Sequence, residues 1–209
     1  MASKSTLGKL KERERETRKN LIIDAAINLF AKKSFKNVSM RAIAAEAGIS
    51  PASIYRYFAD RDDLFVAALS REGMDISRNL ERLIRENGDF SLEKIAAVFV
   101  GYLLEHDNFF QMMTHFMMDS SISEESLQRF NEAERYLLNI FDDIFRKIGV
   151  RENVRLISHA FFASLNGTVI TFRKYPGRSD EEVRRHVHRL AVLLADIFKK
   201  GARQPAPPT

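Results

Sequence analysis

The chain has 209 residues, of which 45% are hydrophobic and 29% are charged, a balance that is ordinary for a globular protein with a buried core. It contains no cysteine, which excludes a disulfide scaffold and thiolate chemistry. Residues 1–18 lack the apolar core of a signal peptide, and no apolar run approaches the roughly 18 residues of a membrane span. We therefore expect a cytoplasmic protein that does not enter a membrane.

The charge is unevenly distributed along the chain. Residues 1–61 hold 13 Lys and Arg against 6 Asp and Glu, a net charge of +7. The other 148 residues hold 20 against 22, a net charge of −2. A basic first third is typical of a polyanion-binding module joined to a module with another task, although a basic surface often serves solvation alone.

The first 17 residues are polar, and the charges from Lys9 to Lys19 alternate in sign. This pattern favours a salt-bridged helix extension or a disordered arm over a basic arm that contacts DNA phosphates, because the glutamates cancel half of the positive charge. A helix is expected from about residue 18 to 33. Its apolar stripe comprises Leu21, Ile22, Ala25, Ala26, Leu29 and Phe30.

Two short helices joined by a tight turn are predicted between residues 39 and 61. Ser39 is a favourable N-cap for the first helix, and Gly48 can adopt the left-handed conformation that a sharp turn needs. Ser50 can cap the second helix, in which Pro51 occupies the first position, where its missing N–H costs nothing.

Small and apolar residues complete the pattern of a helix-turn-helix. Ala44 allows close approach of the two helices, Gly48 makes the corner, and Ile54 and Phe58 close a small core against Ile43. The second helix of such a unit lies in the DNA major groove.

The block from Gly48 to Leu64 (GISPASIYRYFADRDDL), preceded by SMRAIA from Ser39, closely resembles the DNA-binding signature of the TetR/AcrR family of bacterial regulators. The resemblance covers roughly residues 18–70. It implies an all-α fold, with a homeodomain-like helix-turn-helix domain followed by a helical ligand-binding and dimerisation domain. The expected segments are a charged arm (1–17), the DNA-binding domain (18–64), the helical domain (65–200) and a disordered tail (201–209).

The candidate DNA contacts fall into two groups. Arg41, Arg61 and the capping residue Ser39 are expected at phosphates, and the resemblance adds Tyr57 to them. The residues left to face base edges are Ser50, Ala52, Ser53, Tyr55 and Arg56. Arg56 is suited to bidentate reading of a guanine, and Ala52 to contact with a thymine methyl group.

The remaining chain shows only helical periodicity. Asp60 can cap a long helix that continues to Asn87 and Gly88. Later helices are expected over 91–105, 107–118, 121–148, 152–174 and 179–200, with capping-box spacing at Ser121/Glu124 and Ser179/Glu182.

The resemblance places a homodimer interface on the last two helices, where periodicity by itself indicates only apolar faces. The candidate interface residues are Phe161, Leu165, Val169, Leu190, Leu194 and Phe198, and small residues at 163, 164 and 167 would allow close approach.

The segment from Phe109 to Met118 holds four Met and three Phe, which could form adaptable walls of a pocket for an apolar effector. The competing interpretation, ordinary core filling, is somewhat favoured. The candidate ligand residues are Phe109, Met112, Met113, His115, Phe116 and Asn166.

The sequence therefore predicts a homodimeric regulator that binds a palindromic operator, most simply a repressor released by a small apolar effector of unknown identity. A regulator controlled by a protein partner or by its own concentration remains open. A helical enzyme finds no support, because no catalytic, metal-binding or cofactor-binding motif is present. The adjacent Asp142 and Asp143 are expected on a solvated face.

Overall fold

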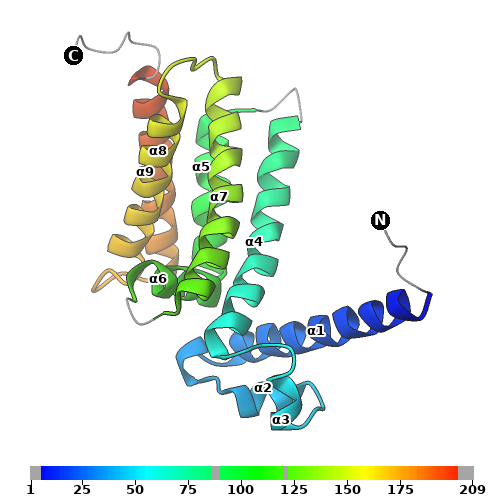
Figure 1. The fold of residues 1–209 in the computed structure, drawn as a ribbon. Coiled ribbons are helices and arrows are strands. Elements are labelled where there is room, and N and C mark those ends of the chain that lie inside the picture. The colour runs from blue at the N-terminus through cyan, green and yellow to red at the C-terminus, as the bar shows by residue number, and fades with distance from the viewer. Residues whose placement is uncertain (1–5, 86–89, 120–121, 202–209) are drawn as a thin grey trace. The chain divides into compact units, whose positions relative to one another are not determined.

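The computed structural model describes residues 6–85, 90–119 and 122–201, which form helices and connecting turns without any strand (Figure 1). None of the helices in these residues is long and apolar enough to cross a bilayer. The elements are α1 (Thr6–Lys32), the 3-10 helix η1 (Phe35–Asn37), α2 (Met40–Glu46), α3 (Pro51–Ile54), α4 (Arg61–Arg85), α5 (Leu92–Glu105), α6 (Asp107–Met118), α7 (Glu124–Lys147), α8 (Val154–Phe172) and α9 (Asp180–Gly201). The predicted all-α class is confirmed.

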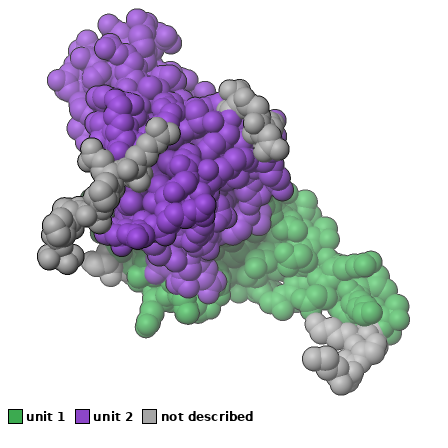
Figure 2. All heavy atoms as spheres, turned by 90° about the horizontal axis from the view of Figure 1, so that it is seen from above, with its two compact units in different colours: residues 1–71, 111–130 green, residues 72–110, 131–209 purple. Residues whose placement is uncertain are grey.

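The chain divides into two compact units, coloured separately in Figure 2. Unit 1 comprises residues 1–71 and 111–130, and unit 2 comprises residues 72–110 and 131–209. Helices α4, α6 and α7 each contribute residues to both units. Unit 1 contains both the helix-turn-helix and the start of α7. The predicted segments instead assigned the start of α7 to the helical domain.

The core of unit 1 forms where α1 packs on the helix-turn-helix. Ile22, Ala26 and Phe30 of the predicted α1 stripe are buried, whereas Leu21 is 56% exposed. The rings of Phe30 and Phe65 meet edge to face with centroids 4.9 Å apart. Such aromatic pairs contribute about 0.5–1.5 kcal/mol beyond the area that they bury.

Helix α1 begins at Thr6, about twelve residues before the position expected from its apolar stripe. The extension is a helix with exposed, charged side chains, in line with the first of the three interpretations of the charged segment. The guanidinium of Arg18 lies 2.7 Å from a carboxylate oxygen of Glu14 one turn earlier. Pairs at this spacing support an exposed helix by a few tenths of a kcal/mol each.

Two arginines tie together distant parts of unit 1. Arg71 in α4 donates hydrogen bonds to the side chains of Asn20 and Asp24 in α1. Arg129 in α7 pairs with Asp63, whose side chain is largely buried at the start of α4. Because Asp63 also accepts the backbone N–H of Ala59 at 3.0 Å, its carboxylate is paired with charge and with hydrogen bonds, as a buried acid requires.

Unit 2 is built from longer helices around an aromatic core. Helix α9 packs along α5 and α8, and the ring of Phe161 in α8 meets those of Phe145 and Phe198 at centroid distances of 5.5 and 5.1 Å. Phe99 and Phe141 form a further edge-to-face pair at 5.2 Å.

Unit 2 encloses the polar side chains of Asp142 and Ser158, and Glu72 is half-buried in it. Asp142 is only 3% exposed and accepts a hydrogen bond from the hydroxyl of Ser158, so the expectation of a solvated carboxylate at this position is wrong. The buried face of α7 includes position 142, and only Asp143 points to solvent. Burial, and to a smaller extent Asp75, raises the pKa of Glu72 to about 7.

Side-chain caps start three of the later helices in the described residues. Ser91 caps α5 by accepting the N–H of Lys94 at 3.1 Å. The Ser179–Glu182 capping box is confirmed, because each residue's side chain accepts the other's backbone N–H, at 2.8 and 3.3 Å. At α7 the Oγ of Ser123 accepts the N–H of Ser126 at 3.3 Å. The expected cap at residue 121, the stop signal at 87–88 and the tail beyond 201 lie outside the described residues.

Candidate DNA-binding surface

The two helices of the helix-turn-helix begin at the predicted caps. The Oγ of Ser39 accepts the N–H of Ala42, and the Oγ of Ser50 accepts the N–H of Ser53, each at 3.2 Å. Gly48 has a φ of +67°, which makes the corner between the helices and which a residue with a side chain adopts only with strain. Each cap contributes about 1 kcal/mol, so these hydrogen bonds fix where both helices begin.

Helix α3 is a single turn from Pro51 to Ile54. The backbone then tightens, because the N–H of Arg56 bonds to Ser53 O at 3.2 Å and that of Tyr57 bonds to Ile54 O at 3.0 Å. These i→i+3 bonds narrow the helix at its end. Ile54 and Phe58 are nevertheless buried, as predicted.

The side chains proposed for base contacts lie on the outside of this turn. Tyr55 is 56% exposed, and Arg56 and Ala52 are exposed too. Tyr57 is half-buried. Among the described residues Arg56 has neither an ion pair nor a hydrogen bond through its guanidinium, so its donors are available to an external acceptor.

The predicted phosphate contacts are exposed as well. Arg41 points to solvent from the first turn of α2, next to the capping residue Ser39. The guanidinium of Arg61 lies 5.2 Å above the ring of Phe65, which holds it at the start of α4. Its distance from the Asp62 carboxylate is 3.9 Å, too long for a strong competing pair at an exposed position.

Arg18 in α1 is a cation at this surface that the sequence did not single out. Its guanidinium interacts with Glu14 and with the Tyr57 hydroxyl, and both raise the pKa of Arg18. The neighbouring Lys19 lies over the Phe58 ring at 5.6 Å. Both residues directly precede the apolar stripe of α1, but their position beside the helix-turn-helix depends on tertiary packing, which the sequence pattern does not specify.

The candidate ligand residues are mostly buried. Met112 and Phe116 are 0% and 2% exposed, and Phe109, Met113 and Asn166 are buried too, whereas His115 is half-buried beside Asp119 at 3.4 Å. Phe109 and Asn166 belong to unit 2, and the others to unit 1. The amide nitrogen of Asn166 donates to Phe162 O at 2.9 Å, while its buried Oδ1 has no hydrogen-bond partner in the described structure.

The candidate dimer residues differ in exposure. Phe161, Leu165 and Val169 are fully buried in unit 2, so they are core residues of the single chain. The α9 candidates are half-buried. The exposed apolar side chains on these two helices are instead Leu156, Ile170, Leu193 and Ile197.

Comparison with known proteins identifies the family. Residues 22–68 match the family model described as bacterial regulatory proteins, tetR family. An uncharacterised HTH-type transcriptional regulator of Haemophilus influenzae is 30% identical over 142 residues, which are 66% of this chain and 66% of that protein.

Two further matches come from Bacillus subtilis. The fatty acid metabolism regulator protein is 28% identical over 160 residues, covering 72% of this chain and 81% of the relative. A crystal structure of the regulator FadR in complex with stearoyl-CoA superposes with a TM-score of 0.63 at 24% identity, over 84% of this chain and 96% of that one. The matched residues include both helices of the helix-turn-helix and their caps, and the chain belongs to the TetR/AcrR family of DNA-binding transcriptional regulators.

Proposed function

We propose that the chain is a cytoplasmic, homodimeric repressor that binds a palindromic operator and leaves it when a long-chain acyl-CoA binds. The observation that carries the DNA-binding part is the exposed turn after α3. This turn directs Tyr55 and Arg56 outward, while Ile54 and Phe58 anchor it from behind. A recognition element of this kind reads the major groove with the side chains at the start and outer face of its helix.

The exposed residues divide into two roles in this proposal. Arg56 reads a guanine through its two parallel donors, Ala52 contacts a thymine methyl group, and the base-facing set is completed by Ser50, Ser53 and Tyr55. The phosphate-binding set comprises Ser39, Arg41, Tyr57 and Arg61, and Arg18 beside Tyr57 joins it.

Two variants test this division by fluorescence anisotropy on operator and random duplexes at several salt concentrations. Arg56→Ala should relax specificity at one base pair, at a cost of about 1–3 kcal/mol on the operator only. Arg61→Ala should weaken binding to both duplexes alike and reduce the slope of log K against log salt by about one. If each variant lost the same affinity for the operator as for the random duplex, the division into base-reading and phosphate-binding residues would be refuted.

A homodimer is proposed because a single recognition element covers too few base pairs for useful affinity. The exposed face of α8 supports it: Leu156 and Ile170 lie at the ends of a stripe that has small residues between them. This stripe follows the three-and-four spacing of a helix–helix seam, through Leu156, Ala160, Ala163, Gly167 and Ile170.

Gly167 offers a direct test of this dimer. A Cβ added at Gly167 meets no atom of the chain within 4 Å, so a larger side chain fits the single chain. Gly167→Leu should therefore leave the helical circular dichroism intact and shift the mass measured by light scattering to that of one chain. Ser164→Leu is unsuitable as a control, because it also removes the hydrogen bond from Ser164 to Ala160 O. Asn131→Leu, at an exposed position of α7 outside this stripe, is the better comparison and should leave the mass unchanged.

The effector class rests on the relatives and on composition. The B. subtilis relative is a fatty acid metabolism regulator, and the structurally similar FadR was crystallised with stearoyl-CoA. The Met and Phe side chains of α6 suit a long apolar chain, because unbranched Met adapts to irregular contacts. The unpaired Oδ1 of Asn166 could accept a hydrogen bond from the effector's amide groups.

Release of DNA then follows from linkage. The effector is expected to bind more tightly to a conformation in which the two recognition elements no longer fit one duplex. The protein's affinity for DNA then falls by the ratio of the effector's affinities for this conformation and for the DNA-binding one. The continuous helices α4, α6 and α7 have residues in both units and are candidates to transmit the change. The test is an operator titration with stearoyl-CoA, using free coenzyme A as the control.

A second candidate is a regulator without a small-molecule effector. Complete burial of Met112 and near-complete burial of Phe116 favour it, since they are what ordinary core residues show. This candidate predicts that stearoyl-CoA changes neither the operator affinity nor the unfolding temperature of the protein. The effector proposal predicts changes in both.

A further inference from the structure

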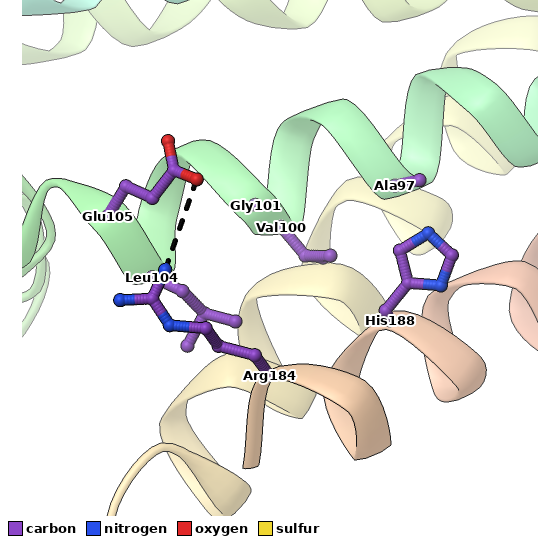
Figure 3. A pocket seen from close by; sticks show the side chains of 7 residues that line it. All are labelled: Ala97, Val100, Gly101, Leu104, Glu105, Arg184 and His188. Atoms are coloured by element: carbon purple, nitrogen blue, oxygen red, sulfur yellow. Dashed lines mark ion pairs between the residues drawn. The ribbon is translucent and has the colours of Figure 1, made fainter. Parts of the chain in front are cut away.

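A groove of about 130 Å³ lies between α5 and α9 within unit 2 (Figure 3). Its apolar floor comes from α5, where Ala97, Gly101 and Leu104 share one helix face. The polar rim consists of Glu105 at the end of α5 and of Arg184 and His188, one turn apart on α9. The groove therefore combines an apolar surface with two nitrogen donors.

Gly101 shapes the floor of this groove. A glycine inside a helix costs about 1 kcal/mol relative to alanine, and α5 has no turn or break at this residue. A Cβ added at Gly101 meets no atom within 4 Å, so packing within the chain does not require the missing side chain. The residue instead leaves room for an external group to approach the α5 backbone.

The rim offers one guanidinium to an anion. Arg184 Nη1 lies 4.0 Å from Glu105 Oε1, and both side chains are more than half exposed, so their ion pair is loose and contributes little. A carboxylate that accepts two parallel hydrogen bonds from the guanidinium would form the stronger pair and could replace Glu105. His188 lies farther along the groove, beside Ala97 (Figure 3).

The groove stays accessible in the proposed dimer. Ile197, an exposed apolar residue of α9, is nine positions from His188, which is about half a turn around the helix. A partner chain seated on the Ile197 side of α9 would therefore leave the groove uncovered. Its volume is below the roughly 300–1,000 Å³ of sites for drug-sized ligands, which restricts the occupant to a small molecule.

We propose that the groove lined by Gly101, Arg184 and His188 binds a small monocarboxylate with a compact apolar body, separately from the effector proposed above. The carboxylate pairs with Arg184, and the apolar body rests on the α5 face at Gly101. Benzoate is a suitable probe of this class, with an expected dissociation constant on the order of 1 mM for so few atoms.

The experiment is a benzoate titration of the full chain, followed by amide chemical shifts in NMR and by calorimetry. The Gly101 amide should shift and saturate. Arg184→Gln should weaken binding at least tenfold, and Gly101→Leu, which fills the floor, should do the same without loss of helix. Arg185→Gln removes the same charge from a neighbouring exposed position outside the groove and should stay within twofold of the native protein.

Three results would overturn the proposal. The first is a Gly101 amide that does not move up to about 20 mM benzoate, well above the expected dissociation constant. The second is binding that survives Gly101→Leu, which would place benzoate elsewhere, including at the proposed acyl-CoA site. The third is equal binding of benzamide, the uncharged analogue, which would exclude recognition of the carboxylate.

Discussion

The two units differ in what holds their helices in place. In unit 1 the two short helices of the helix-turn-helix and the start of α4 have side-chain caps, where Ser39, Ser50 and Asp60 each accept a backbone N–H at 2.8–3.2 Å. In unit 2 long helices surround a network of phenylalanine rings centred on Phe161. Local hydrogen bonds thus specify the proposed reading surface residue by residue, whereas nonlocal burial specifies unit 2.

The largest expected effect tests the burial side of this contrast. Phe161→Ala removes a fully buried ring from the centre of unit 2 and should lower the free energy of unfolding by about 3–5 kcal/mol, as measured by urea denaturation. Phe161→Leu is the matched control and should cost less. A loss below about 1 kcal/mol for the alanine variant would show that the core collapses freely around the site.

Removal of a buried hydrogen bond comes next. Ser158→Ala deprives the buried Asp142 of its hydroxyl donor and should cost about 1–3 kcal/mol of unfolding free energy. Ser164→Ala removes a hydroxyl that bonds only to Ala160 O within the same helix, and it should change stability by less than about 0.5 kcal/mol. Similar losses for the two variants would show that the hydrogen bond from Ser158 to Asp142 contributes no more stability than a hydroxyl bonded within its own helix.

The local side of the contrast predicts a smaller effect. Ser50→Ala removes the cap of α3 and should cost about 1 kcal/mol in thermal unfolding. Ser50→Asp keeps a capping oxygen and should restore most of that stability, while its negative charge should weaken binding to every DNA duplex. If Ser50→Asp binds DNA as tightly as the native protein, α3 does not approach the phosphates.

The smallest predicted effect concerns pH. Because the pKa of Glu72 is raised from 4.5 to about 7 in the folded protein, the folded state binds more protons than the unfolded state between these values. Its contribution is therefore favourable below pH 4.5 and is lost as the pH rises through 7. After solvent screening we expect about 1 kcal/mol or less.

Glu72→Gln keeps the shape of the side chain and removes the titration. Its unfolding free energy should depend less on pH between 4.5 and 7, and above pH 7 the variant should be the more stable protein. An unchanged pH dependence, measured by urea denaturation at each pH, would show that the Glu72 carboxyl is solvated in the folded protein.

The sequence predicted the parts that depend on neighbours in the chain. The caps at Ser39 and Ser50, the turn at Gly48 and five of the six stripe positions of α1 follow from local spacing and are confirmed, whereas Leu21 of that stripe is exposed. The end of α3 at Ile54 was not predicted, because residue preference does not reveal where i→i+3 bonds replace i→i+4 bonds.

Features that depend on tertiary packing escaped prediction. Spacing indicated an apolar face through Phe161 and Leu165, but it could not say whether that face packs inside the chain or against a partner. In the same way, Asp142 and Asp143 look equivalent in the sequence. Their environments differ because Ser158 of α8 packs against Asp142 and hydrogen-bonds to it, whereas Asp143 stays exposed. The roles of individual residues at DNA or at an effector remain predictions.

The ion pair between Asp63 and Arg129 has a practical consequence for protein engineering. Exchange of DNA-reading modules between relatives usually assumes that a module is one continuous stretch of sequence. Here residues 111–130 belong with the first 71, and the stacked rings of Phe116 and Phe130, 5.5 Å apart, lie in that same stretch. A chimaera that transplants both stretches together retains the pair, whereas one spliced after residue 71 would pair its Asp63 with whatever side chain the recipient carries at position 129.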